Sequence, residues 1–264
     1  MFNLFGKKKA KSPVTSDDAL WIENNLLWIH QRIVDITKQP TFLPKTPYFD
    51  RHFKGNERDA EYLLERIGDM FGIDSNNIRL GFFDEQTHDF GYGVSTMKED
   101  SDGRAGTYLF DDGRHEINIE VGQLKNTESL IATIAHEMSH YILIGMHEIG
   151  YSDDTENEYL TDLLAIAYGF GIFIGNSSFY RKTWTSGDGY SGWQIGKQGY
   201  LPREVTGYAM ALIEMYKRFP EQDPEIFSFM QKDFQRTFRK SLAYVNENQG
   251  EIKQRGNSEN LFVW

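Results

Sequence analysis

The sequence predicts an α+β fold in which a small, mostly antiparallel sheet is followed by a long run of helices. Residues 78–121 contain short segments in which apolar and polar residues alternate, which is the period of half-buried strands. The segments on either side carry apolar residues at steps of three and four, which is the period of amphipathic helices. With 264 residues, 39% hydrophobic and 14% aromatic, the chain is long enough to bury one sizeable core.

Two helices are expected before the sheet. The first starts at Ser16-Asp17-Asp18 and is ended by Pro40. Residues 40–50 contain three prolines, which favours an extended connector. The second helix is expected from Asn56 to Phe71, with Gly72 closing it.

Three strands are expected next, at residues 78–83, 107–110 and 115–121. The second and third are joined by Asp111-Asp112-Gly113, a sequence typical of a tight hairpin turn. Alternation along residues 115–121 indicates one buried face. Residues 84–106 are interpreted as a mobile acidic loop.

The helix expected after the sheet carries the most informative residues of the chain. Thr127 is a suitable N-cap and Gly145 a suitable stop, and apolar residues between them recur at helical spacing. His136 and His140 are four residues apart, so both imidazoles lie on one side of this helix, one turn from each other. Two imidazoles so placed can hold one zinc ion, and the intervening Glu137 can take a proton from water.

A third protein ligand is needed, and the next helix offers candidates. Glu158 and Asp162 share one face of a helix that starts near Asp153. Glu158 can reach the metal while Asp162 accepts a hydrogen bond from the far nitrogen of a ligating histidine. Three alternatives stay open. Residues 155–158 also form a capping-box pattern that would turn Glu158 back to its own helix start, and Asp162 or His147 could be the ligand instead.

The pattern HExxH at 136–140, followed by Asn157-Glu158 and Thr161-Asp162, resembles the gluzincin class of zinc metallopeptidases, whose best-known member is thermolysin. The resemblance covers residues 136–162. It implies a zincin-like fold with His136, His140 and Glu158 as zinc ligands, Glu137 as general base and Asp162 as the carboxylate that orients a ligand. The flanking residues 160–176 also resemble poorly characterised bacterial proteins with HExxH-like motifs, which leaves the substrate open.

The same resemblance leads to expectations around the site. Zincins place a sheet edge beside the HExxH helix, where it binds an extended peptide by strand addition. Residues 115–121 are the candidate for that edge, and an ordinary inner strand is the alternative. A donor for the developing oxyanion is also needed. The candidates are Tyr200, Arg203 and Tyr208, which lie in or after a loop, residues 177–199, that is expected to cover the site.

Composition narrows the partners and the compartment. The net charge is −11, although the first eleven residues contain four lysines, so a nucleic-acid-binding surface is not expected. The chain has no cysteine, which excludes disulfides and thiolate ligands. It shows neither a secretory signal nor a membrane span, the nearest apolar run being Leu163–Ile174, so a cytoplasmic protein is expected. Residues 1–11 offer at most a weak membrane contact.

These expectations combine into one prediction with one alternative. The chain is divided into a basic disordered leader (1–12), an N-terminal helix and linker (13–45), a zincin-like metallopeptidase domain (46–245) and a polar tail (246–264). The predicted function is hydrolysis of peptide bonds in a peptide or protein substrate, with one Zn²⁺ as cofactor. The alternative is a catalytically silent, zinc-containing binding or regulatory protein, motivated by the missing histidine donor for the oxyanion. The sequence does not predict the oligomeric state.

Overall fold

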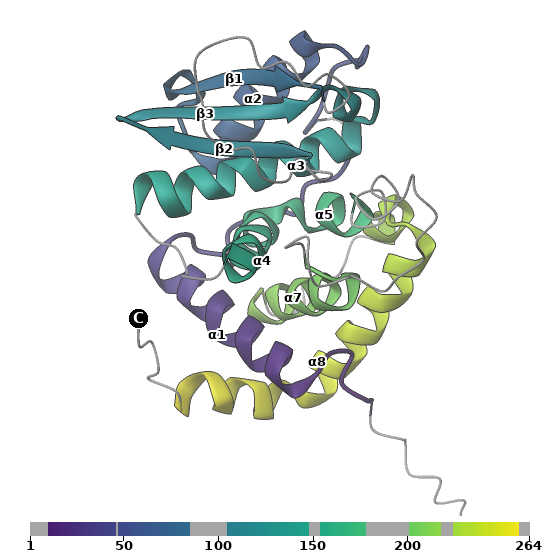
Figure 1. The fold of residues 1–264 in the computed structure, drawn as a ribbon. Helices are drawn as coiled ribbons and strands as arrows, with labels where there is room; N and C mark the ends of the chain where they lie inside the picture. The colour runs from purple at the N-terminus through teal and green to yellow at the C-terminus, as the bar shows by residue number, and fades with distance from the viewer. Residues whose placement is uncertain are drawn as a thin grey trace, which may run out of the picture.

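A three-stranded sheet lies at one end of the molecule and helices fill the rest, which confirms the α+β class (Figure 1). The computed structural model describes residues 10–45, 47–84, 105–147, 154–177, 201–217 and 224–258. Most of the basic leader and most of the two predicted loops, at 84–106 and 177–199, lie outside the described residues.

The sheet is mixed, not mostly antiparallel. It consists of β1 (Ile78–Phe83), β2 (Gly106–Asp111) and β3 (Arg114–Glu120) in the order β1-β3-β2. Strand β3 pairs antiparallel with β2 and parallel with β1. The predicted hairpin turn is present, with positive φ at Asp112 and Gly113 as a two-residue hairpin loop requires.

The position of β3 decides between the two expectations for residues 115–121. They form an inner strand and not a peptide-binding edge, and β2 is the edge beside helix α3 (Thr127–His140). The reason is the long connection between β1 and β2. It allows β1 to pair with the side of β3 that the hairpin leaves open, a placement that local sequence does not encode.

The helices before the sheet largely follow the sequence signals. Helix α1 (Ser16–Arg32) is capped by Thr15, whose side chain accepts the Asp18 N–H, but it ends well before Pro40. Helix α2 (Glu57–Phe71) begins with a capping box at Asn56 and ends at Gly72 in the left-handed conformation, as predicted. A short 3₁₀ turn, η1 (Ser75–Asn77), leads into β1.

Helix α3 lies between the sheet and most of the remaining helices, in contact with β2, β3, α2 and the two helical segments at 154–165 and 171–177 (Figure 1). Its N-cap is Asn126, one residue before the predicted Thr127, and the helix does not stop at Gly145 but passes into a π-helical turn that ends at Met146. The elements around it are η2 (Val121–Lys125), η3 (Tyr141–Met146), α4 (Asp154–Ala165), η4 (Ile166–Phe170) and α5 (Gly171–Ser177).

The run from α4 to α5 is the apolar centre of the molecule. Glu156–Ser177 forms a helix of 22 residues, long and apolar enough to cross a bilayer, whereas the sequence indicated a run of only about a dozen residues. The whole of its apolar window is buried inside the molecule, as in a core helix of a soluble protein. Gly169, with φ +102, bends it where the backbone of Pro40 packs against it.

Helices α7 (Arg203–Tyr216) and α8 (Lys232–Ser258) close the other side, with the 3₁₀ turn η5 (Pro224–Phe229) before α8. Helix α8 continues beyond residue 246, where a polar tail was expected to begin, and its Ile252 is buried in the core. Near its end, Arg255 donates two hydrogen bonds to the buried carboxylate of Glu23 on α1. The same hydrophobic core therefore includes residues from α1 to α8.

Candidate metal centre

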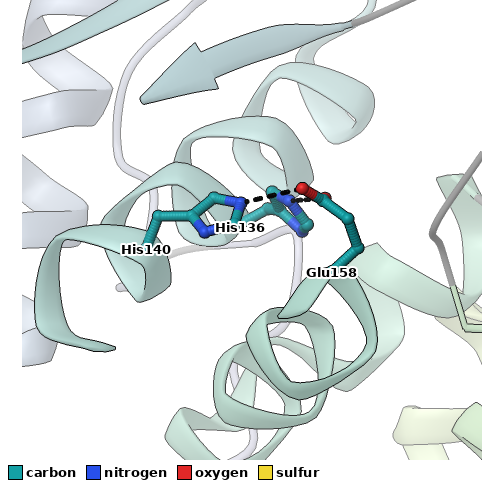
Figure 2. A group of neighbouring side chains, drawn as sticks. All are labelled: His136, His140 and Glu158. Atoms are coloured by element: carbon teal, nitrogen blue, oxygen red, sulfur yellow. Dashed lines mark hydrogen bonds and ion pairs between the residues drawn. The ribbon is translucent and has the colours of Figure 1, made fainter. Parts of the chain in front are cut away.

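Three potential metal ligands converge between α3 and α4. His136 and His140 lie one turn apart on α3, both buried, and Glu158 faces them from α4 (Figure 2). The Nε2 of His136 is 2.9 Å from Glu158 Oε2, and the Nε2 of His140 is 3.4 Å from Glu158 Oε1. One ligand atom from each residue lies within 4.8 Å of the other two, so the predicted cluster is confirmed.

The geometry favours Glu158 among the alternatives for the third ligand. Helix α4 starts at Asp154, and the Glu158 carboxylate turns toward the histidines, which differs from the capping-box alternative. Asp162 contacts the opposite nitrogen of His136. His147 follows the π turn and is absent from the group of potential ligands found among the described residues.

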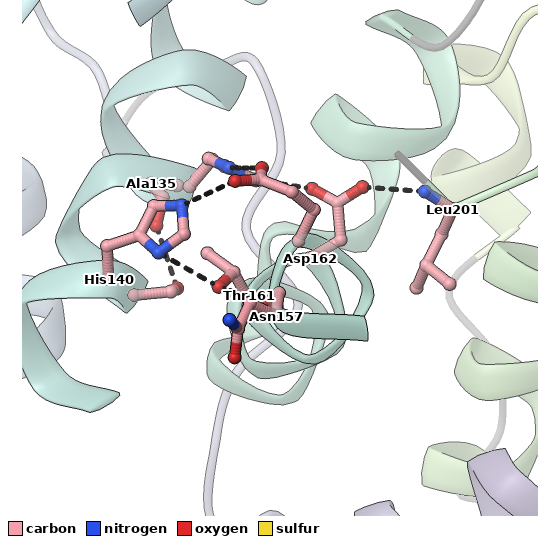
Figure 3. A network of polar contacts seen from close by, with 9 residues as sticks. Ala135, His140, Asn157, Thr161, Asp162 and Leu201 are labelled. Atoms are coloured by element: carbon pink, nitrogen blue, oxygen red, sulfur yellow. Dashed lines mark hydrogen bonds and ion pairs between the residues drawn. The ribbon is translucent and has the colours of Figure 1, made fainter. Parts of the chain in front are cut away.

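Each histidine is held by a second partner on α4. His136 donates from Nδ1 to Asp162 Oδ1 over 2.8 Å. Figure 3 shows the other oxygen of Asp162, Oδ2, which accepts the backbone N–H of Leu201 at 2.9 Å. The Thr161 hydroxyl donates to the Asn157 carbonyl and lies 3.2 Å from His140 Nδ1, which can therefore donate to it. Because both Nδ1 atoms have partners on α4, both Nε2 atoms face Glu158. This is the orientation that the two histidines and Glu158 need in order to bind one cation together.

The electrostatics of the group suit a cation. Burial disfavours the charged form of His136, but hydrogen bonds with Asp162 and Glu158 outweigh it and raise the pKa of His136 to about 10. Burial would raise the pKa of Glu158, yet hydrogen bonds from His136 and His140 hold that pKa well below its ordinary value. The pocket therefore stabilises positive charge beside an ionised carboxylate.

The donor set fits a divalent metal ion. Two imidazole nitrogens and one carboxylate oxygen are the ligands of catalytic zinc sites that keep a position for water. The same donors also bind other divalent ions, so they do not identify the metal. His136, His140 and Glu158 therefore form a group that could hold a metal ion.

Glu137 lies directly beneath the first residue of β2. A Cβ atom at Gly106 would be 2.8 Å from Glu137 Oε1 and 2.8 Å from Thr133 Cγ2, so only glycine fits without displacing one of them. Sequence analysis missed Gly106 because the strand was expected to begin at Thr107. The signal was present in the two-residue period of β2, which puts residues 106, 108 and 110 on one face.

Tyr108, the next residue on that face, was also missed. Its ring lies parallel to that of His140, with centroids 6.3 Å apart, and its hydroxyl is 2.7 Å from His115 Nδ1. Burial raises the pKa of Tyr108 to about 12 and lowers the pKa of His115. Tyr108 is therefore a neutral hydroxyl donor next to a metal-ligand candidate.

Two of the three predicted oxyanion donors, Arg203 and Tyr208, lie among the described residues. Tyr208 is fully buried and donates to Glu23 at 2.6 Å, so its hydroxyl already has a partner inside the core. Arg203 donates to Gln231 at the start of α8. Tyr200 lies outside the described residues.

Comparison with protein-family models, with curated proteins and with solved structures returned no match. The resemblance to gluzincins therefore rests on the motif residues themselves and on the geometry that brings them together.

Proposed function

We propose that this protein is a zinc-dependent peptidase. The observation that carries the proposal is the convergence of His136, His140 and Glu158, with both Nδ1 atoms held by α4 and with Glu137 adjacent in sequence. Zinc held by the three ligands would act as a Lewis acid on a carbonyl oxygen and lower the pKa of water. Glu137 then accepts the proton of the attacking water and donates it to the leaving amine.

The edge strand β2 supports a peptide as the substrate. In the described part of the chain β2 pairs with β3 alone, so the N–H and C=O groups on its other edge can pair with an extended chain. Gly106 places that edge against Glu137. A peptide added to β2 would therefore pass the proposed general base, and we assign to β2 the edge role that was expected for residues 115–121.

A metal-containing binding protein is the second candidate. It is favoured by the position of Tyr208, a predicted oxyanion donor, which is fully buried and donates to Glu23. Such a protein would keep the metal group and cleave nothing.

Substitution Glu137→Gln separates the two candidates. Zinc content is measured by elemental mass spectrometry, and cleavage of an internally quenched decapeptide library is followed by fluorescence. A peptidase should contain one zinc per chain in both forms, and the variant should lose cleavage by about 10²–10⁴-fold, the usual contribution of a general base. The control His140→Ala should lose the metal. A library left uncut by the zinc-loaded wild type would favour the binding protein, and equal turnover in Glu137→Gln would remove Glu137 from the mechanism.

A further inference from the structure

A cluster of exposed apolar side chains lies at one end of β2. Within the described residues five large apolar side chains are exposed, and four of them fall on β2 or on the π turn η3 that follows the metal helix. Their exposed fractions are 52% for Leu109, 50% for Phe110, 37% for Ile144 and 57% for Met146. The fifth, Leu20, lies on α1. Exposed apolar clusters of this kind mark interaction sites.

His115 lies between the exposed side chains of β2 and those of η3. The ring of Phe110 stacks on His115 with centroids 4.8 Å apart, and His115 packs edge-on against Tyr141 at 4.6 Å. A Cβ atom built at Gly145 would lie 3.0 Å from His115. Gly145 stands between Ile144 and Met146, so the exposed residues of η3 lie on the same side of the sheet as Phe110, whereas Leu109 points to the other side.

The patch continues the edge that passes Glu137. Gly106 lies against Glu137, and Phe110 follows four residues later, about 14 Å along the strand at the usual rise. Leu109 and Phe110 point to opposite faces of β2, so a chain paired with this edge would meet apolar surface on both sides. A polar substrate would leave this surface exposed.

We infer that the patch of Leu109, Phe110, Ile144 and Met146 selects peptide substrates with a large apolar residue about three to five positions from the scissile bond. The inference rests on the proposed peptidase function. Asp111 and Asp112 adjoin the patch at the hairpin turn, and their negative charges disfavour an anionic membrane surface as the occupant. The edge of β2 offers backbone pairing as well, which suits an extended peptide.

The test uses zinc-loaded protein and pairs of decapeptides found in the library screen, identical except for Leu or Ser three to five residues from the cut. Wild type should cleave the Leu peptide with about tenfold higher kcat/KM, mainly through KM, as expected for burial of one apolar side chain. The double variant Leu109→Ser/Met146→Ser should lose that preference and cleave the Ser peptide as before. Leu20→Ser, an exposed apolar residue elsewhere, should keep the preference.

The outcomes are distinct. Cleavage without a preference at these positions, or a preference that survives the double variant, overturns the inference and leaves the peptidase proposal standing. No cleavage of any peptide at full zinc occupancy overturns both. Conversion of a wild-type dimer to a monomer by the double variant, with unchanged peptide preference, would show that the patch is a contact between copies.

Discussion

Substitution Gly106→Ala should damage catalysis far more than it damages the fold. The new methyl group would lie 2.8 Å from Glu137 Oε1, whereas ordinary contacts begin near 3.4 Å, so the carboxylate must move by about 0.6 Å or rotate away. A displacement of about 1 Å at a catalytic group costs up to about 10²-fold in rate. We therefore expect kcat to fall by about 10–100-fold.

The stability cost should be modest because Glu137 Oε1 ends a flexible side chain, although Thr133 Cγ2, also at 2.8 Å, is stiffer. Overpacking of this size costs about 1–3 kcal/mol, partly offset by the lower chain entropy of alanine. None of the three atoms nearest to a Cβ at Gly106 belongs to His136, His140 or Glu158, so zinc content should stay at the wild-type level.

The assay is peptide cleavage at full zinc occupancy, together with urea unfolding of the same samples. Gly250→Ala is the matched control, because a Cβ at Gly250 on α8 meets no atom within 4 Å. The control should be as active as wild type and slightly more stable, since alanine favours helix over glycine by up to about 1 kcal/mol. The reasoning fails if Gly106→Ala keeps wild-type kcat, because Glu137 would then not depend on its position under β2.

Three further predictions concern the surroundings of the site. Asp162→Asn should weaken zinc affinity by about 10–100-fold, because Asp162 orients His136, and competition with a chromophoric chelator measures the change. In chelator-treated protein the raised pKa of His136, about 10 against 6.5 in the unfolded chain, should stabilise the fold fully below pH 6.5, and this stabilisation should be lost as the pH rises to 10. Urea unfolding across this pH range measures the loss, which the variant His136→Gln should not show. Tyr208→Phe should lower the free energy of unfolding by about 1–2 kcal/mol, since Glu23 loses one donor, while zinc content and cleavage stay unchanged; reduced cleavage in that folded variant would return Tyr208 to the site.

The local features of the fold could be predicted because each depends on residues close in sequence. The spacing of His136 and His140 puts their rings on one side of α3, and Asn56 and Gly72 mark the ends of α2 by their own capping chemistry. Glu158 could be proposed because HExxH requires a third ligand and the second helix returns along the first.

What could not be predicted depends on pairings between distant segments. Strand β3 is central because it pairs in parallel with β1. The alternation of apolar and polar residues along β3 does not indicate which strand will pair with it. Tyr208 looked suitable as an oxyanion donor because its helix follows the metal helices. Its actual partner, Glu23, lies 185 positions earlier and is found only when α1 packs against α7.

The ion pair between Glu23 and Arg255 bears on when α1 can dock while the chain is being synthesised. The two residues are 232 positions apart, so α1 emerges from the ribosome long before its buried carboxylate can meet the guanidinium on α8. Without Arg255 the buried Glu23 carboxylate keeps its hydrogen bond from Tyr208 but loses its charged partner, which is destabilising, and contacts of such long range form late in folding. The first helix to be made should therefore be among the last to dock, and a nascent chain halted before residue 255 should remain susceptible to proteases at α1.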